Sequence, residues 1–533
     1  MKINIKKIVF PTVLIVISTF LLFHFPYEVF MDEFVSFADG AKLYSVGHFT
    51  HGYFCHGIIN AYLVEISAYL SGIEKSFEVA RFLNGIIGCL TIIGSYLLAR
   101  EIFDDKTAFL SGIILLSSPY FVISSHRLLS DNPATLFFTL SLFAFSRYWC
   151  REDKRYLLLF SLCYGISVAA KLTTLPLLAP LVLLVLIQKK FKIRPFLKST
   201  FQFFLLSLLA FFIIFPHTLI HFNYFLKDVF FYEFFRIDKG IDADPFVSQI
   251  PKTFLSGYKF YISELIALGF HKFILLIVLA GLVYLSIRML WKRKDYLEQK
   301  KLILVIPLTF SFLFFGFLRN YYLRYIMPVF PLIAIISAGF FFQILEVYNE
   351  RYKISLRLFQ TAIASAMIVS LGINTGVIWK INEVKKRRIE FFELAKSIKR
   401  YAEKGDFISF DFLQGANFDS SLYGEPLGSY PLMMAGIARD IILINPLITA
   451  KPQKLPSLII TADKRQTDDS FVLIDEIKTP EKLRNEIINI EFNSIKRYTY
   501  LLEKAPYYID EVSHFYEKRG GGFPDKFFIY QKK

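Results

Sequence analysis

The stretch that decides the fold is residues 8–34, which read IVFPTVLIVISTFLLFHF, then PYEVF, then MDEF. Its first part carries no charged side chain and is close to the length of about 20 residues that crosses a bilayer. Lysines precede this run and no small-residue cleavage site follows it, so we expect an uncleaved anchor with a cytoplasmic N-terminus. The adjacent carboxylates Asp32 and Glu33 then lie where the chain leaves the bilayer.

The rest of the sequence has the composition of a polytopic membrane protein. It has 533 residues, is 54% hydrophobic, includes 60 Phe and has a mean hydropathy of +0.45, a combination that soluble domains do not show. Apolar runs recur to about residue 380 and then stop. Hydropathy and charge together predict about eleven spans, at residues 8–25, 80–99, 107–124, 133–149, 156–170, 174–188, 201–220, 273–290, 302–318, 325–345 and 359–379.

The charge distribution predicts the orientation in the membrane. The formal charge is +16, and its excess lies before residue 381, with 37 Lys and Arg against 23 Asp and Glu, whereas residues 381–533 have 24 against 22. The short loops at one end of the predicted spans are basic, as cytoplasmic loops are, so no nucleic-acid partner is needed to explain the charge. An odd number of spans then places the C-terminal part outside, and we expect the plasma membrane of a prokaryote.

Two domains are predicted. Residues 1–380 form a membrane all-α domain with long external loops at 26–79 and 221–272, and residues 381–533 form a soluble extracytoplasmic α/β domain. The four cysteines have no CxxC spacing, so neither a disulfide framework nor a zinc knuckle is indicated. In the second domain, helical stretches alternate with five β-like runs, at Phe407–Phe410, Ile441–Ile444, Ser457–Thr461, Phe471–Ile474 and Phe527–Tyr530.

Three carboxylates are candidates for catalysis. Asp32 and Glu33 follow the first span, and Asp131 lies in the external turn before the fourth span. Ionisable residues beside spans mark function more often than elsewhere. The alternatives are structural, because Asp32 and Glu33 would suit the first turn of an interfacial helix. Asp131 would equally suit the start of a helix that has Pro133 near its first turn.

Four cations on the same predicted face are candidates for binding phosphate. Lys171 lies in a short external turn, Arg127 precedes Asp131, and Arg319 and Arg324 follow the ninth span. A guanidinium suits bidentate contact with phosphate, and a lone external lysine runs against the positive-inside bias. The alternative for Lys171 is that its long side chain extends to the interface, where the ammonium is hydrated.

Three histidines, His48, His51 and His56, lie in the first external loop. We take His51 and His56 as candidates for binding substrate or a metal ion. Their spacing matches no familiar zinc motif, and histidines in loops also act as ordinary hydrogen-bonding groups. The sequence therefore predicts no firm cofactor, and a divalent metal stays an open alternative.

Short motifs follow one another along residues 8–345 in a fixed order. They are Asp32-Glu33, His56-Gly57-Ile58-Ile59, Gly72-Ile73-Glu74, Ala80-Arg81-Phe82-Leu83-Asn84-Gly85, Ala99-Arg100-Glu101-Ile102-Phe103, Ser118-Pro119, Arg127, Asp131, Ala170-Lys171-Leu172-Thr173 and Arg324-Tyr325-Ile326-Met327-Pro328-Val329-Phe330-Pro331. This order resembles the ArnT-like and protein O-mannosyltransferase-like glycosyltransferases, which are membrane enzymes of the GT-C fold. The chain departs from them at His56-Gly57-Ile58, where the family often has His-Pro-Pro.

The resemblance implies a sugar donor linked to polyprenyl phosphate and an acceptor hydroxyl on a protein, lipid or glycan. On this interpretation Asp32 is the general base, Glu33 supports it, Asp131 positions hydroxyls or cations, and the four cations hold the donor phosphate. Direct displacement would invert the anomeric centre. Two alternatives are a polytopic transporter or flippase of lipid-linked sugars, and a non-catalytic binding subunit. A transporter would be expected to have broken or charged segments near the midplane, often in internal repeats, and no repeat is evident.

Overall fold

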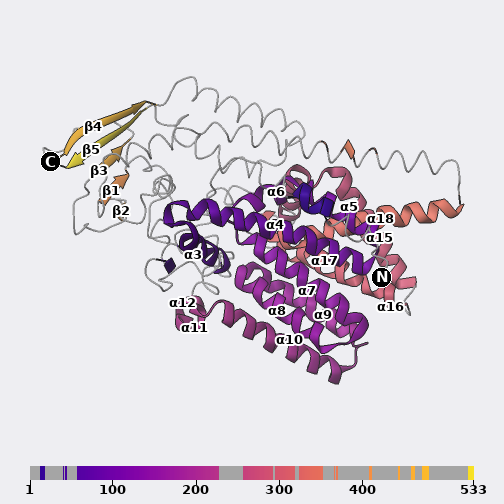
Figure 1. The fold of residues 1–533 in the computed structure, drawn as a ribbon. Helices are drawn as coiled ribbons and strands as arrows, with labels where there is room; N and C mark the ends of the chain where they lie inside the picture. The colour runs from indigo at the N-terminus through magenta and orange to yellow at the C-terminus, as the bar shows by residue number, and fades with distance from the viewer. Residues whose placement is uncertain are drawn as a thin grey trace. The chain divides into compact units, whose positions relative to one another are not determined.

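The computed structural model describes residues 12–18, 57–226, 256–291, 295–317 and 323–351, single positions at 36, 40, 43–44, 365, 368–369 and 372, and five strands between 407 and 532. These residues fall in two compact units (Figure 1). The first comprises Met1–Phe25, Phe54–Asn60 and Arg81–Trp379, and the second comprises Pro26–Tyr53, Ala61–Ala80 and Lys380–Lys533. Each unit is described by itself below.

The described residues before 352 are helical. In chain order the elements are α3 (Ile59–Ser71), α4 (Ile73–Ile102), α5 (Asp105–Leu116), α6 (Pro119–His126), α7 (Asp131–Arg151), α8 (Lys154–Ala170), η2 (Leu172–Leu177), α9 (Leu178–Gln188), α10 (Ile193–Ile214), α11 (His217–Ile220), α12 (Phe222–Leu226), α14 (Ser256–Glu264), the π-helical turn η5 (Leu265–Gly269), α15 (Lys272–Trp291), α16 (Tyr296–Lys300), α17 (Leu302–Phe317), η6 (Leu323–Val329) and α18 (Phe330–Arg351).

Five helical segments of the described chain are long and apolar enough to cross a membrane, or up to six if one bent pair counts as a span. They are Val79–Ile102, Ile193–Ile214, Lys272–Met289, Glu298–Phe317 and Leu323–Ile344, and each lies at a predicted span. The chain is therefore an integral membrane protein. The count of eleven stays a prediction. The spans predicted at 8–25 and 359–379 lie mostly outside the described residues, and the helices at 133–149, 156–170 and 174–188 are not among the segments found long and apolar enough.

The span predicted as continuous at 107–124 is broken. It consists of α5 and α6, whose axes differ in direction by 70°. Pro119 is the first residue of α6 and lacks the N–H that would continue α5, while the Ser118 hydroxyl accepts a hydrogen bond from the Phe121 amide at 3.4 Å. Hydropathy alone does not detect this break. Its consequence is that α6 ends at Arg127, just before α7 begins.

Helices α7, α8 and α10 pack closely through small residues. A Cβ atom on Gly165 of α8 would lie 2.2 Å from the carbonyl oxygen of Ser207 on α10, so only glycine allows this approach. Next to it the Ser207 hydroxyl donates to the Ser161 carbonyl at 3.0 Å, and the rings of Phe160 and Phe203 stack at 4.3 Å. On the other side of α8, the Ser167 hydroxyl donates to the Ala134 carbonyl of α7 at 2.8 Å. This packing fixes where α7 begins and α8 ends.

The second unit contains a five-stranded mixed sheet with the order β2-β1-β3-β5-β4. Strands β2, β1 and β3 are parallel, whereas β5 pairs antiparallel with both β3 and β4. All five lie at the predicted β-like runs; they are β1 (Phe407–Phe410), β2 (Ile442–Ile444), β3 (Leu458–Thr461), β4 (Phe471–Lys478) and β5 (Lys526–Lys532). The connections between the strands lie outside the described residues, so the α/β class of this domain stays a prediction.

Candidate active site

A buried ion pair joins the beginning of α7 to the end of α8. The Lys171 ammonium lies 2.6 Å from Oδ1 of Asp131, and the two side chains are 7% and 1% exposed. Lys171 does not extend to a hydrated surface, which removes the interfacial alternative for this residue. Burying two charges is favourable only when their partners are well placed, so the surroundings of the pair decide its role.

Asp131 uses only part of its hydrogen-bonding capacity. It is the first residue of α7, where a carboxylate complements the helix dipole, and Ser130 before it makes no side-chain cap bond. Oδ1 accepts from Lys171, whereas Oδ2 is buried and has no hydrogen-bond partner in the described part of the chain. A buried carboxylate oxygen without a donor costs stability. Asp131 therefore serves the helix start and also offers one acceptor atom.

Lys171 is held by the end of α8. It has an extended backbone, and its amide donates to the Ser167 carbonyl at 3.1 Å. Its own carbonyl accepts from the Thr174 amide at 3.1 Å and from the Thr174 hydroxyl at 2.8 Å. These hydrogen bonds fix the Lys171 backbone on both sides of the side chain, so the point from which the side chain extends is fixed.

The chain immediately after His56 docks on the same helix end. Gly57 has a φ of +70°, and a Cβ there would lie 1.9 Å from the Ala170 carbonyl oxygen. The next amide, of Ile58, donates to the Ala169 carbonyl at 3.2 Å. Proline cannot adopt this φ, so the glycine that replaces the family's first proline has a structural reason. Gly57 and Ile58 therefore lie directly against the end of α8 that positions Lys171.

Arg127 lies in the tight turn between α6 and α7. It is 6% exposed, its amide donates to the Ser124 carbonyl at 3.1 Å, and its carbonyl accepts from the Leu129 amide at 2.8 Å. The Asn84 side-chain amide of α4 also donates to this carbonyl. At the other end of the turn, the side-chain amide of Asn132 donates to the Ser124 carbonyl at 2.7 Å. Sequence reasoning missed Asn84 and Asn132 as positioning residues, although Asn84 belongs to one of the quoted motifs.

Arg324 lies on a neighbouring element. It is partly exposed and belongs to η6, which packs against α7 and against η2, the turn that follows Lys171. Of the four predicted cations, Lys171 therefore contacts Asp131, while Arg127 and Arg324 lie on segments next to α7.

The remaining predicted site residues lie outside the described residues. These are Asp32, Glu33, His51, His56 and Arg319, and their roles stay predictions. Within the described residues, no group of three or more His, Cys, Asp or Glu could hold a metal ion.

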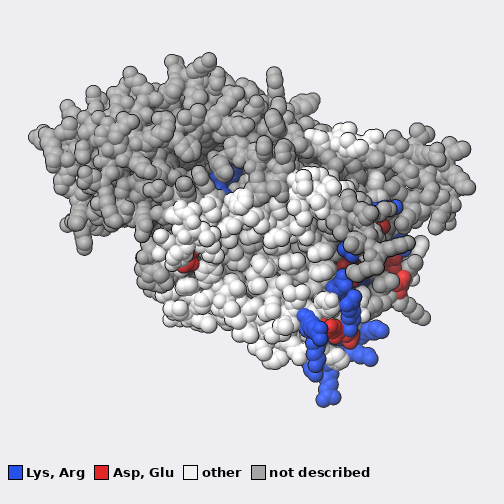
Figure 2. All heavy atoms as spheres, in the orientation of Figure 1, with Lys and Arg blue, Asp and Glu red and all other residues white. Residues whose placement is uncertain are grey.

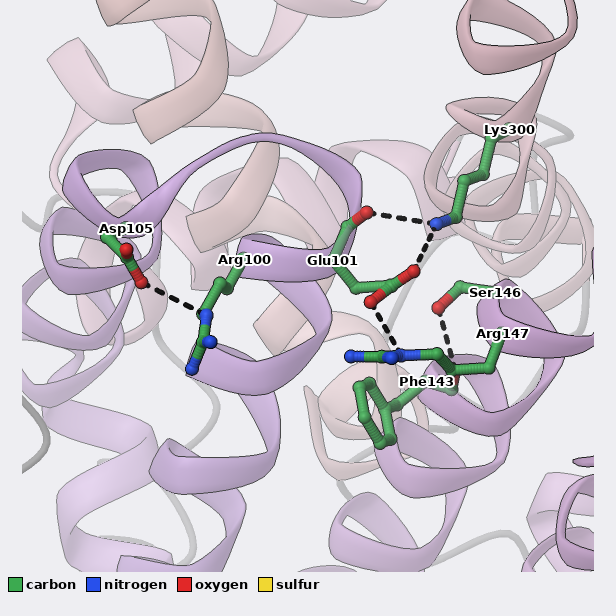
Figure 3. A network of polar contacts seen from close by, with 7 residues as sticks. All are labelled: Arg100, Glu101, Asp105, Phe143, Ser146, Arg147 and Lys300. Atoms are coloured by element: carbon green, nitrogen blue, oxygen red, sulfur yellow. Dashed lines mark hydrogen bonds and ion pairs between the residues drawn. The ribbon is translucent and has the colours of Figure 1, made fainter. Parts of the chain in front are cut away.

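A second ionic cluster lies at the other end of α7, about 24 Å along the helix axis from Asp131. Glu101 of α4 pairs through Oε2 with Nε of Arg147 at 2.6 Å and through Oε1 with Nζ of Lys300 at 2.7 Å (Figure 3). Lys300 also donates to the Glu101 carbonyl at 2.9 Å, and Arg100 pairs with Asp105 at 3.1 Å. This cluster joins α4, α7 and α16, and the sequence analysis did not predict it.

Comparisons with known proteins bear on the family and the fold. The family described as dolichyl-phosphate-mannose-protein mannosyltransferase matches residues 55–220. An uncharacterised protein of Aquifex aeolicus is 29% identical over 280 residues, which span 49% of this chain and 48% of that protein. The match therefore covers about half the length of this curated relative.

Two solved structures share the fold. ArnT from Cupriavidus metallidurans bound to undecaprenyl phosphate superposes with a TM-score of 0.55 at 12% identity, covering 85% of this chain and 92% of that one. The oligosaccharyltransferase of Archaeoglobus fulgidus in the apo form gives 0.54 at 15% identity, with 83% and 64% covered. The chain has the GT-C fold and resembles the ArnT-like and protein O-mannosyltransferase-like glycosyltransferases.

Proposed function

We propose that this protein transfers a sugar from a polyprenyl-phosphate donor to an acceptor hydroxyl on the extracytoplasmic side of the membrane, with inversion. The observation that carries the proposal is the buried Asp131–Lys171 pair, in which Oδ2 of Asp131 has no donor among the described residues. The likeness to the ArnT fold, whose structure was solved with undecaprenyl phosphate bound, supports the choice of donor.

The phosphate of the donor is assigned to the cations. Lys171 and Arg324 are the leading ligands, and Arg127 and Arg319 complete the set. When the bond between the anomeric carbon and the phosphate oxygen breaks, negative charge grows on the lipid phosphate. Fixed cations in a largely dehydrated region stabilise this charge more in the transition state than in the ground state.

The acceptor hydroxyl needs a base, because its pKa lies far above neutral pH. Asp32 takes the proton as the hydroxyl oxygen attacks the anomeric carbon, the carbon–oxygen bond to phosphate breaks, and the electron pair leaves with polyprenyl phosphate. Proton transfer of this kind typically contributes about 10²- to 10⁴-fold. Glu33 supports Asp32. Attack opposite the leaving group inverts the anomeric centre.

Asp131 has two tasks in this proposal. Oδ1 holds the Lys171 ammonium at 2.6 Å, and Oδ2 is the acceptor atom for a hydroxyl of the sugar or of the acceptor substrate. His51 and His56 are proposed as substrate ligands, with binding of a divalent metal as their alternative role. The soluble α/β domain lies outside and meets the acceptor, which is a protein, a lipid or a glycan. The odd number of spans predicted from the sequence would put it on that side.

The test is transfer in membranes that contain the full chain and a labelled polyprenyl-phosphate sugar. Asp32→Asn should abolish transfer while undecaprenyl phosphate still binds. Near-normal transfer by this variant would disprove the assignment of the base. Mass spectrometry of glycans and lipids, on cells with and without the gene, tests the reaction class. An unchanged glycoconjugate profile would favour a transporter or a binding subunit.

A further inference from the structure

A basic surface lies at the turns that join α7 to α8 and α9 to α10. We name it the basic corner and define it by seven exposed cations, Arg151, Lys154, Arg155, Lys190, Lys192, Arg194 and Lys198. Figure 2 shows blue side chains gathered at the end of the bundle where Figure 1 places these turns. It is the end of α7 opposite to Asp131, so the basic corner is separate from the candidate active site.

The backbone of this corner is strained. In the described part of the chain, three non-glycine residues have a left-handed φ, and all three belong to these two turns: Glu152 at 51°, Lys190 at 52° and Phe191 at 58°. Such conformations are unfavourable for residues that have a Cβ, and they cluster where function requires them. Two backbone hydrogen bonds fix the second turn. The Lys190 amide donates to the Ile187 carbonyl at 2.8 Å, and the Phe191 amide donates to the Leu186 carbonyl at 3.1 Å.

The two turns are tied into one surface. Oε1 of Glu152 accepts from Nε2 of Gln188 at 3.1 Å and pairs with Nζ of Lys189 at 3.3 Å. The Lys189 ammonium also lies 5.1 Å from the ring centroid of Tyr148. Glu152 is the exposed acid of the corner, and its charge is already matched by Lys189, which is not one of the seven exposed cations. Asp153, the other acid of these turns, caps α8 by accepting a hydrogen bond from the Arg155 amide at 2.9 Å. The seven exposed cations outnumber the two acids, so most of their positive charge is left for an external partner.

An apolar stripe begins at the same corner and runs along α10. Ile193, Leu197, Phe201, Phe204 and Leu208 recur at helical spacing and are all exposed, Ile193 to 70% and Phe201 to 67%. Helix α10 is one of the segments long and apolar enough to span the membrane, and only 28% of it is buried within the protein. If α10 crosses a bilayer, the stripe faces acyl chains, and the basic corner at its end lies at the level of the head groups of the same leaflet.

We infer that an anionic phospholipid binds along α10, with its acyl chains on the apolar stripe and its phosphate at the basic corner. The positive charge of the basic corner complements the anionic head group of such a lipid. The apolar stripe begins at these cations, so the surface as a whole matches the amphipathic shape of the lipid. A soluble polyanion, such as a nucleic acid, would leave the stripe unused. This inference does not depend on the proposed transfer reaction.

The test is native mass spectrometry of the full chain in detergent, titrated with phosphatidylglycerol and with phosphatidylcholine that has the same acyl chains. The wild type should prefer phosphatidylglycerol by at least about tenfold, and the preference should fall as salt is raised. Replacing Lys190, Lys192, Arg194 and Lys198 with Gln should abolish the preference. The matched control exchanges Lys for Arg and Arg for Lys at the same four positions, retains the charge and should keep it.

Three results would overturn the inference. The first is equal binding of the two lipids by the wild type, and the second is an unchanged preference in the four-Gln variant. The third is full competition by excess glycerol phosphate, which would assign the corner to a soluble anion. The salt dependence is measured on the wild type, so the inference stays testable if the four-Gln variant does not fold.

Discussion

The two ends of α7 carry ionic groups that differ in burial and in how completely their carboxylates are paired. At one end both carboxylate oxygens of Glu101 have cationic partners, Arg147 and Lys300. At the other end Asp131 has one partner, Lys171, and its Oδ2 has none in the described part of the chain, although Arg127 and Arg324 lie on adjacent elements. A complete network such as that of Glu101 stabilises the fold, whereas the incomplete group of Asp131 and Lys171, in which one buried carboxylate oxygen lacks a donor, is the arrangement expected of a binding site.

The largest effect is expected at Gly57, on which the geometry of the incomplete group depends. Gly57→Ala would place a Cβ 1.9 Å from the Ala170 carbonyl oxygen, on a backbone that is itself left-handed. Backbone cannot yield as a flexible side chain does, so we expect almost no folded protein. The measurement is the yield of monodisperse protein after extraction in detergent.

Gly72→Ala is the matched control for this substitution. Gly72 has a φ of +79°, but a Cβ there would meet nothing within 4 Å. The left-handed backbone alone should cost about 1 kcal/mol, and the yield should stay close to that of wild type. Equal yields of the two variants would show that the approach of Gly57 to Ala170 is unimportant.

The next largest effect is expected from removing the cation of the incomplete group. Lys171→Met should lower transfer, and the affinity for undecaprenyl phosphate, by about 10²- to 10³-fold, as loss of one electrostatic ligand typically does. It also leaves the Asp131 carboxylate buried without its partner, which should destabilise the fold by about 3 kcal/mol. The measurements are labelled-sugar transfer, binding of undecaprenyl phosphate and the thermal unfolding midpoint.

A double variant separates the two consequences. Lys171→Met combined with Asp131→Leu removes both charges, so stability should recover toward wild type while binding stays lost. Recovery of binding together with stability would contradict the phosphate assignment, because the pair would then be structural, as the Glu101 cluster is.

Breaking the complete network of Glu101, Arg147 and Lys300 should lower stability and leave transfer unchanged. Glu101→Gln leaves Lys300 and Arg147 without a compensating charge, and Lys300 is 4% exposed. We expect about 2 kcal/mol of destabilisation, with transfer per folded molecule unchanged. The unfolding midpoint and the transfer rate, normalised to folded protein, check this. A large loss of transfer at normal stability would assign a functional role to this end of α7.

Local patterns in the sequence account for much of the fold. Hydropathy located five described spans, and β-like runs located all five strands. Hydropathy did not locate the break at Ser118-Pro119, because the mean hydropathy of a window stays the same when the chain changes direction inside it. The capping residue and the proline were visible in the sequence, but their effect on direction depends on the packing of α6.

The candidate site was predictable only in part. Charge bias placed Asp131, Lys171 and Arg324 on one face, and the structure brings Asp131 and Lys171 into contact. Contacts between distant positions carry no local signal. Lys300 meets Glu101 across 199 residues, and Asn84 meets Arg127 across 43. A polar residue inside an otherwise apolar span, as Asn84 is, was the one signal that could have pointed to the second contact.

The smallest effect is expected at Asn84, which positions the incomplete group without touching its charges. Asn84→Ala removes the amide that donates to the Arg127 carbonyl, a bond whose net contribution is about 1 kcal/mol. Affinity for undecaprenyl phosphate should fall about fivefold, while the unfolding midpoint changes little. Asn84→Gln keeps an amide and should restore part of the affinity, whereas Asn84→Asp cannot donate and should not. If the three variants lose stability and affinity in parallel, Asn84 supports the packing of α4 and not the position of Arg127.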